Sequence, residues 1–268
     1  MKFEQIAVVL LVLGVVFATY VYYELNAVFI RTYTVLIRGL PKALEDFTIL
    51  HISDLHAKEF GREQSRLVKI IKEHQFDMIA LTGDLIDHKK PDARPAVNLM
   101  RELKDKPAFF VTGNHERWVK TNLVEALVAE GVVHLQNQAV KLEQGKEDIW
   151  VVGVEAPHAA GHVGKALLPI DDPAPKILLA HSPNIFNSAA RHDIDLVLVG
   201  HTHGGQVRIP GLRALYAPGQ GLWPKYDHGL FSLGKTTMVV SAGLGESSFS
   251  IRVAMRPEIV LVKLVSAK

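Results

Sequence analysis

Three short apolar runs alternate with segments of helical pattern in the first half of this 268-residue chain, and this alternation constrains the fold most strongly. The runs are FTILHIS (47–53), FDMIALT (76–82) and PAFFVT (107–112), and each suits a buried strand. Helical patterns lie between them at 62–75 and 92–104. Strands that alternate with helices predict a parallel sheet with right-handed crossover connections.

The second half of the chain is richer in strands. One helix is predicted over 183–191, and the stretch 204–231, rich in Gly and Pro, is predicted to form long loops. The complete pattern predicts an α/β fold of two packed mixed β-sheets with helices on the outside. The strands expected in this half are VVHLQ (132–136), QAVKLE (138–143), DIWVVGV (148–154), KILLAH (176–181), LVLVG (196–200), TTMVVSA (236–242) and EIVLVKL (258–264).

The amino terminus has a different composition. The run from Ile6 to Tyr23 has no charged residue, and at ~1.5 Å per residue it nearly crosses a hydrocarbon layer of ~30 Å. A cleaved signal peptide or a buried helix has the same apolar character. However, only Lys2 precedes the run and no Ala-x-Ala site follows it. We therefore expect a retained transmembrane anchor in residues 1–30.

Residues 31–46 are interpreted as a juxtamembrane linker or a first edge strand, and the folded domain is expected over 47–268. Lys and Arg residues near the apolar run favour one orientation. Lys2 precedes the run, whereas Arg31, Arg38 and Lys42 follow it. Because cytoplasmic flanks are enriched in basic residues, this asymmetry places the domain in the cytoplasm.

Composition excludes several classes of site. The formal net charge is +2, which gives no polycation signal, so we expect no nucleic-acid partner. The chain has no cysteine, which excludes disulfides, thiolate zinc sites and a cysteine nucleophile. It has 13 histidines, and imidazole is a common metal ligand.

Five polar segments, each placed directly after an apolar strand, carry the candidate chemistry. The carboxyl ends of parallel strands meet at one edge of a sheet, so we expect these segments to form one cleft. Imidazole and carboxylate ligands suit Mn, Fe, Zn or Co, and two such cations need a bridging anionic ligand. We also expect Asp54 and His56, like His201 and His203, to point to the same side through strand alternation. The segments are Asp54-Leu55-His56, Gly83-Asp84-Leu85-Ile86-Asp87, Gly113-Asn114-His115-Glu116, His181, and Gly200-His201-Thr202-His203-Gly204-Gly205.

These segments resemble the motifs of the calcineurin-like metallophosphoesterase superfamily across about residues 47–264. The resemblance implies an αββα sandwich and a metallophosphoesterase catalytic domain over 47–268, which would hydrolyse a phosphodiester or pyrophosphate bond. It implies two divalent cations as cofactors, with Mn favoured and Fe or Zn as alternatives. Water activated by the two cations would attack phosphorus in line.

The resemblance also implies a role for each motif residue. His115 would contact the phosphate and protonate the leaving group, and Asp87 would orient a ligand or a loop from behind the metal ligands. One metal would be held by Asp54, His56, Asp84 and His203, and the other by Asp84, Asn114, His181 and His201.

Further downstream the chain resembles a narrower branch. The segments Tyr226-x-x-Gly229-Leu230, 241–245 and 256–259 are similar to those of small, amino-terminally membrane-targeted bacterial phosphodiesterases, the YkuE/YaeI-like group. That branch includes enzymes similar to UDP-2,3-diacylglucosamine pyrophosphohydrolase of lipid A synthesis. The resemblance thus implies a lipid-linked substrate and a single-pass protein of the bacterial inner membrane. A broad-range envelope or nucleotide phosphodiesterase is the alternative. A non-catalytic scaffold is a remote alternative because every expected ligand is present.

The remaining histidines and several loop residues are given ordinary roles. We expect the first group of histidines to be structural or exposed, and a second group to be able to line the cleft. Four apolar residues near loops are interpreted as ordinary packing or as a patch for acyl chains beside the membrane. The first group is His51, His74, His88, His134 and His192, the second is His158, His162 and His228, and the apolar residues are Trp118, Leu222, Trp223 and Phe231.

Overall fold

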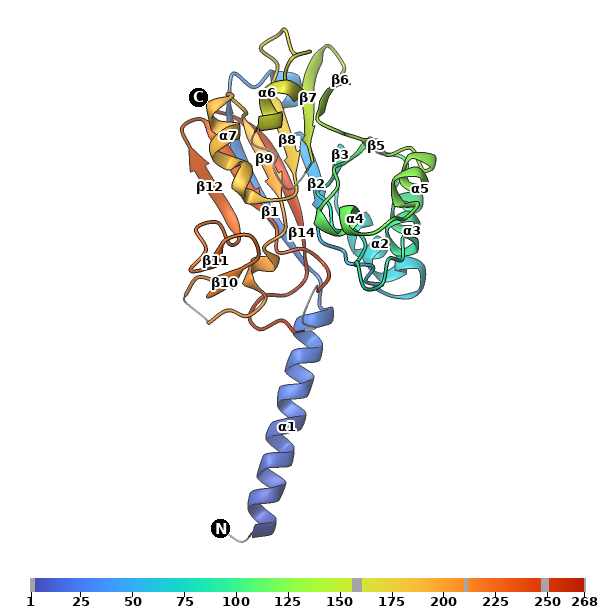
Figure 1. The fold of residues 1–268 in the computed structure, drawn as a ribbon, viewed down its shortest axis with the longest axis vertical. Helices are drawn as coiled ribbons and strands as arrows, with labels where there is room; N and C mark the ends of the chain where they lie inside the picture. Colours follow the sequence, from blue (N-terminus) through green and yellow to red (C-terminus); the bar gives the residue numbers. More distant parts are fainter. Residues whose placement is uncertain (1–2, 156–160, 210–211, 247–250, 268) are drawn as a thin grey trace.

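Two six-stranded mixed β-sheets packed face to face form the body of the protein, and one long helix projects from it (Figure 1). The computed structural model describes residues 3–155, 161–209, 212–246 and 251–267. The expected α/β class with two mixed sheets is therefore confirmed.

The first sheet contains the strands expected in the first half of the chain, together with the two ends of the folded domain. β2 pairs antiparallel with β14, and every other pair in this sheet is parallel. Its strands, in spatial order, are β1 (Phe29–Arg38), β14 (Glu258–Ala267), β2 (Thr48–Ile52), β3 (Met78–Leu81), β4 (Ala108–Phe110) and β5 (Val133–His134).

The second sheet is parallel at its centre and antiparallel at both edges, because β12 and β6 each form a hairpin with the neighbouring strand. A separate two-stranded hairpin joins β10 (Tyr216–Ala217) to β11 (Gly221–Leu222). The strands of the second sheet, in spatial order, are β12 (Gly229–Leu233), β13 (Thr236–Val240), β9 (Leu196–Val199), β8 (Lys176–Ala180), β7 (Glu147–Val154) and β6 (Gln138–Gln144).

Alternate residues along each central strand divide the apolar side chains between two cores. Ile49 and Leu196 lie in the core between the sheets, whereas their neighbours Leu50 and Val197 face the outer helices. The first sheet is covered by one helical layer and the second sheet by another, so the four layers are α, β, β and α. The first helical layer is α2 (Ser65–Lys72), α3 (Arg94–Glu102) and α5 (Leu123–Ala129), and the second is α6 (His162–Ala166) and α7 (Phe186–Arg191).

α1 (Phe3–Asn26) is, among the described residues, the one helix long and apolar enough to cross a membrane, with a mean hydropathy of 2.4. Residues 31–46, however, are not a linker. β1 pairs in parallel with β14 from Phe29 opposite Glu258 onward, and Val35 and Ile37 are buried between the sheets. The edge-strand alternative is therefore the correct one, and the folded domain begins near Phe29 instead of at 47.

Several short elements were not expected from the sequence. The segment 204–231 contains β10, β11 and part of β12 in addition to loops. The short helices α4 (Asn114–Trp118), α5 and α6 were also missed, because five to seven residues carry too little periodicity to be recognised without their tertiary contacts. The remaining elements are the 3₁₀ helices η1 (Lys42–Leu44), η2 (Arg62–Gln64), η4 (Pro183–Ile185) and η5 (His203–Gly205).

Candidate active site

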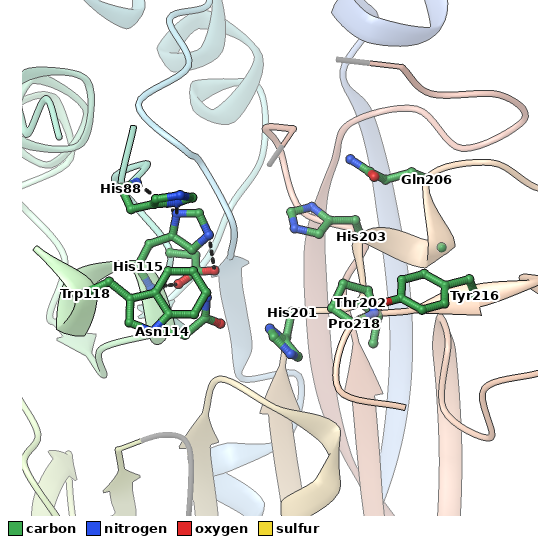
Figure 2. A pocket seen from close by; sticks show the side chains of 12 residues that line it. His88, Asn114, His115, Trp118, His201, Thr202, His203, Gln206, Tyr216 and Pro218 are labelled. Carbon is green, nitrogen blue, oxygen red and sulfur yellow. Dashed lines mark hydrogen bonds and ion pairs between the residues drawn. The ribbon is translucent and has the colours of Figure 1, made fainter. Parts of the chain in front are cut away.

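The five polar segments all lie at the carboxyl ends of central strands, three in the first sheet and two in the second. β2, β3 and β4 lead into the segments of Asp54, Asp84 and Asn114, and β8 and β9 lead into those of His181 and His201. Figure 2 shows Asn114 and His115 on one wall of a cleft and His203 on the opposite wall, with His201 between them. The two sheets thus each supply one half of a single site.

Five of these polar residues, two Asp and three His, adopt left-handed backbone conformations, which are uncommon for residues other than glycine. Strand alternation was expected to point Asp54 and His56, like His201 and His203, to the same side, and this expectation was wrong. β2 ends at Ile52 and β9 at Val199, so the residues lie in tight turns and not on alternating strand positions. The turns, and not the pleat, aim these side chains inward. The φ angles are 51° at Asp54, 48° at His56, 51° at Asp84, 71° at His201 and 50° at His203.

A glycine permits the closest approach between the two halves. The backbone of Gly200 lies so near Ser53 and Asp54 that a Cβ atom at this position would overlap the Ser53 hydroxyl and the Asp54 carboxylate. Gly113 stands in the same relation to Asp84. These positions require glycine because any side chain would push a carboxylate out of the site.

Asp84 lies at the centre of the cluster. Its Oδ2 is 3.2 Å from His181 Nε2 and 3.8 Å from His56 Nε2, while Oδ1 accepts a 2.8 Å hydrogen bond from the backbone N–H of His115. This bond leaves Oδ2 facing imidazoles from both halves of the site. Burial alone would raise the pKa of the Asp84 carboxyl, but the imidazoles of His181, His56 and His115 hold it below its usual range.

One group of potential ligands is formed by Asp54, His56 and His203, whose ligand atoms all lie within 4.8 Å of one another. Asp54 Oδ1 is 3.9 Å from His56 Nε2 and 3.8 Å from His203 Nε2. Both Asp54 oxygens accept the backbone N–H of His201, which fixes the carboxylate in place. Burial raises the pKa of Asp54, so an added positive charge would stabilise its ionised form.

A second group consists of Asp84, His181 and His201, with Asn114 beside them. His181 Nε2 is 3.0 Å from both Asn114 Oδ1 and His201 Nδ1. The other ring nitrogen, His181 Nδ1, lies 2.8 Å from the carbonyl oxygen of Thr82 and can donate to it. In the neutral ring, which a bound cation requires, that bond places the proton on Nδ1 and leaves the lone pair of Nε2 facing the cluster.

The donors fit a pair of divalent cations. The buried Nε2 of His56, which faces the carboxylates of Asp54 and Asp84, has no hydrogen-bond partner among the described residues. A buried unpaired polar atom costs about 1–3 kcal/mol, which a bound cation would offset. Although burial acts to lower it, the carboxylates of Asp84 and Asp54 raise the pKa of His181 to about 10, so the site attracts positive charge. Carboxylate, amide and imidazole ligands suit hard to borderline cations.

His115 is held in one tautomer. The backbone N–H of His88 donates a 3.0 Å hydrogen bond to its Nδ1, so the proton of the neutral ring resides on Nε2. Nε2 lies 3.9 Å from Asp84 Oδ2. Burial is the main reason that the pKa of His115 falls to about 4, so the ring is neutral near pH 7. It can therefore offer an N–H donor to an oxygen beside the cluster.

Asp87 lies behind the cluster. Its Oδ2 is 3.4 Å from His56 Nδ1 and 3.5 Å from His115 Nδ1, and its Oδ1 accepts the backbone N–H of Lys89 at 2.8 Å. Burial opposes ionisation, but these partners lower the pKa of Asp87 to about 2. A carboxylate in this place can orient the His56 ring toward the cluster.

Glu116 is a residue of the motif to which the sequence assigned no role. Its carboxylate accepts backbone N–H groups from two turns at once, those that follow β3 and β4. The bond lengths lie between 2.7 and 3.2 Å. Glu116 therefore holds Asp84 and Asn114 in register without facing the cluster. The donors are Asp84, Leu85, Ile86 and Gly113.

Comparison with known proteins assigns the family. Residues 47–205 match the model of the calcineurin-like phosphoesterase family. The chain belongs to this family. It is therefore a metal-dependent phosphoester hydrolase, and the family uses a dinuclear site of divalent cations.

Relatives in bacteria and vertebrates agree with this membership. The metallophosphoesterase YkoQ of Bacillus subtilis is 30% identical, with coverage of 82% of this chain and 84% of YkoQ. The phosphodiesterase YaeI of Escherichia coli is 30% identical over 82% of both chains. The transmembrane protein with metallophosphoesterase domain of Danio rerio is 31% identical, and the match covers 86% of this chain but 56% of that protein. The resemblance to the YkuE/YaeI-like group is thereby confirmed.

Solved structures of similar fold include the sulfate thiohydrolase SoxB of Thermus thermophilus, with a TM-score of 0.50 and 15% identity. The match covers 84% of this chain and 57% of that one. A putative 5'-nucleotidase of Staphylococcus aureus has a TM-score of 0.53 and 11% identity, with 84% and 55% covered. At these identities the likeness concerns the fold alone.

The phosphoesterase site opens into a pocket of about 310 Å³. His88, expected to be structural or exposed, lines this pocket, and its ring packs edge-on against those of His115 and Trp118. Gln206 and Tyr216 line the opposite wall and were not recognised from the sequence, since they lie in the predicted loop region. Proximity in sequence to the motifs, as with His88 and Trp118, is the one signal that could have indicated them.

The other histidines have local roles. His51 bonds the Thr82 hydroxyl, His134 contacts Glu155, His192 contacts the Ser188 carbonyl and His228 contacts Glu258. His162 is exposed at the start of α6, and His158 lies outside the described residues. Phe231 is half-buried against the second outer core, as ordinary packing requires, whereas Trp118, Leu222 and Trp223 are exposed.

Proposed function

We propose that this chain is a membrane-anchored hydrolase of a phosphodiester or pyrophosphate bond in a lipid-linked substrate. The observation that carries the proposal is the position of Asp84 between two acid–imidazole groups. Its Oδ2 lies 3.8 Å from Nε2 of His56 in one group and 3.2 Å from Nε2 of His181 in the other. Two groups with one common anionic member suit two cations that act on a single phosphoryl centre.

The proposed roles follow from the donor set. Asp54, His56 and His203 with Asp84 would hold one cation, and Asn114, His181 and His201 with Asp84 the other. When bound, the two cations polarise the phosphoryl oxygens and lower the pKa of water. Mn is favoured, and Fe or Zn also suit these ligands.

His115 and Asp87 have supporting parts in this proposal. The Nε2–H of His115 would donate a hydrogen bond to the oxygen on which charge develops as the bond to phosphorus breaks. Transfer of a proton to the leaving group would require the protonated ring, which the negative charge of a bound phosphate would favour. Asp87 would orient His56 through its Nδ1. The rings of His56 and His115, on which these two roles depend, are both buried and pack edge to face in this structure.

A lipid-linked substrate is supported by the amino-terminal helix. α1 is apolar throughout its membrane-length window and is followed at once by β1, so the catalytic domain would lie against the bilayer. Tethering raises the local concentration of a membrane-resident substrate. UDP-2,3-diacylglucosamine is the specific candidate. Arg38 and Lys42 beyond the helix favour a cytoplasmic domain at the bacterial inner membrane.

The test is an assay of purified full-length protein with Mn, Fe or Zn on UDP-2,3-diacylglucosamine, on a soluble phosphodiester and on a nucleotide. Release of UMP from the first substrate is expected. Asp84→Ala should lose both cations and all turnover together, as measured by elemental analysis and product release. The matched control is Asp105→Ala, an exposed carboxylate remote from the motifs, which should retain both.

The outcomes separate the proposal from its rival. Good turnover of the soluble diester or the nucleotide without UMP release would favour the broad-range phosphodiesterase. Full cation content in the Asp84→Ala variant would overturn the shared-carboxylate assignment. Reporter fusions that place the domain outside the cytoplasm would remove UDP-sugars as substrates.

A further inference from the structure

The strand topology determines which end of the domain carries the active site. β1 starts at Phe29, just after α1, and runs away from the helix; β14 is parallel to it. β2 is antiparallel to β14, so it returns toward α1, and β3 and β4 run parallel to β2. The carboxyl ends of these strands, and with them the turns of Asp54, Asp84 and Asn114, therefore lie at the α1 end of the domain.

Direct contacts fix the helix against this end. The Tyr20 hydroxyl accepts the backbone N–H of Ala254, and the Glu24 carboxylate, which is buried, accepts that of Met255 at 2.9 Å. The Met255 side chain in turn packs against Gly204, the neighbour of His203. Tyr20, Tyr22 and Tyr23 lie together near the carboxyl end of α1, where aromatic residues are typical of the membrane interface. The domain thus begins at the level of the interface, with no spacer between helix and site.

The chain beside this contact carries a concentration of exposed apolar side chains. We call residues 207–209 and 212–223 the apolar loop; it includes β10 and β11, which Figure 1 shows at the α1 end of the domain. The loop starts beside the helix contact, because Arg208 N–H donates to the carbonyl of Val253, which precedes Ala254. Its exposed apolar side chains are Val207, Ile209, Leu212, Tyr216, Leu222 and Trp223.

The loop presents these side chains from a fixed backbone. Ala214 and Ala217 are buried, Ala214 N–H donates to Asp227 at 2.9 Å, and Trp223 N–H donates to the carbonyl of Leu215. Leu222 is nevertheless 74% exposed and Trp223 69% exposed. Apolar surface exposed to water is unfavourable, so a neighbouring apolar phase would stabilise these side chains.

Charge on the loop suits a membrane surface as the partner. Between Gln206 and Tyr226 the sequence contains no Asp or Glu, and of its three basic residues Arg208 is paired with Asp227, which leaves Arg213 and Lys225. Arg213 and Lys225 are exposed. Tryptophan and leucine combined with basic residues are typical of segments that lie in the interfacial layer, where anionic lipids attract the basic residues.

The same loop forms one wall of the catalytic pocket. Tyr216 and Pro218 line the pocket opposite Trp118 (Figure 2). Tyr216 pairs with Leu222 across the β10–β11 hairpin, so the exposed apolar side chains of the loop adjoin the edge of the site. We propose that the apolar loop inserts into the interfacial layer of the bilayer that α1 spans, so that the pocket opens at the membrane surface and receives phosphoester head groups directly from the lipid phase. The substrate part of this proposal rests on the function proposed above, whereas the insertion does not.

Insertion is tested by site-specific probes, which the absence of native cysteine makes simple. Full-length Ile209→Cys, Leu222→Cys and Trp223→Cys proteins would be labelled with bimane in nanodiscs of phosphatidylcholine and phosphatidylglycerol. The control is Leu168→Cys, which is 80% exposed just beyond α6, at the end of the domain far from α1. We expect lipid-borne nitroxides to quench the loop probes and aqueous iodide to quench the control. Loop probes that respond to iodide as the control does would overturn the insertion.

Delivery of substrate is tested with two phosphodiesters that share a p-nitrophenyl leaving group. In one the second alcohol is dioleoylglycerol and the compound is held in the nanodisc, and in the other it is methanol and the compound is in solution. Leu222→Asp combined with Trp223→Asp should lower kcat/KM for the lipid diester about tenfold and for the soluble diester less than about twofold. Leu168→Asp should change neither. Equal losses on both substrates would contradict delivery from the membrane. Absence of hydrolysis of both by the unaltered protein would refute the proposed function and leave the probe result to decide insertion.

Discussion

His115 illustrates how much a single side chain depends on its neighbours. As a free imidazole it would be half protonated near pH 6.5. Here burial lowers its pKa to about 4, and the His88 amide occupies Nδ1. The residue is thus a neutral Nε2–H donor near pH 7, which suits stabilisation of a developing oxyanion. The sequence predicted its position in the site, while its protonation state follows from the structure.

The leaving-group dependence of a His115→Ala variant tests this role. The loss in kcat should be about 10²–10⁴-fold for an alkoxide leaving group, which needs a proton, and much smaller for p-nitrophenolate, which does not. His88→Ala is a matched variant, because its backbone N–H still reaches Nδ1. It should retain most activity on both substrates. An equal loss for both leaving groups in His115→Ala would argue that His115 acts only by binding substrate.

At the scale of elements, the site depends on turns that are joined across strands. Glu116, in α4, accepts N–H groups from the turn after β3 and from the turn that precedes its own helix. One carboxylate therefore positions both Asp84 and Asn114. The capping pattern at the start of α4 is legible in the sequence, because Glu lies three residues after Gly113. The contact of Glu116 with the turn after β3 could not be recognised from the sequence, since it joins residues far apart along the chain.

Replacement of Glu116 by Gln should weaken the hydrogen bonds that join the turn after β3 to the turn after β4. An amide has one oxygen and a donor group, so it leaves some of the four N–H groups without an acceptor. We expect the free energy of unfolding to fall by about 2–4 kcal/mol, with weaker Mn binding, as measured by denaturant titration and calorimetry. Glu125→Gln, on the exposed face of α5, should change it by less than about 0.5 kcal/mol. Unchanged stability in Glu116→Gln would show that the turns hold their shape without this carboxylate.

For the whole molecule, the candidate ligands divide between the two sheets. Asp54, His56, Asp84 and Asn114 follow strands of the first sheet, whereas His181, His201 and His203 follow strands of the second. A bound cation pair would therefore connect the sheets at one end of the sandwich. Because the cations bind the folded chain far better than the unfolded one, they should stabilise the entire domain.

Chelation measures that stabilisation. If each of the two cations is present at about ten times its Kd, each contributes about 1.4 kcal/mol and removal of both should cost about 2.8 kcal/mol. For a domain of this size we expect a fall in Tm of about 5–10 °C, reversed by added Mn. The Asp84→Ala protein should show no response to chelator. A Tm that is equal with and without chelator in the unaltered protein would mean that the sheets are held together by apolar packing alone.

Local patterns alone were sufficient to predict most of the architecture and the members of the candidate site. The strands before Asp54, Asp84 and His201 are largely apolar runs, and a polar motif at the end of a parallel strand lies at the sheet edge wherever the strand is placed. Tertiary structure decided what depends on distant pairing. β1 is a strand because it pairs with β14, with Phe29 opposite Glu258. The turn of Asp54 can lie against the second sheet because Gly200 has no side chain. The end of the domain that faces α1 follows from the order of strands in a sheet. A sequence does not state that order, because it results from contacts between residues far apart along the chain.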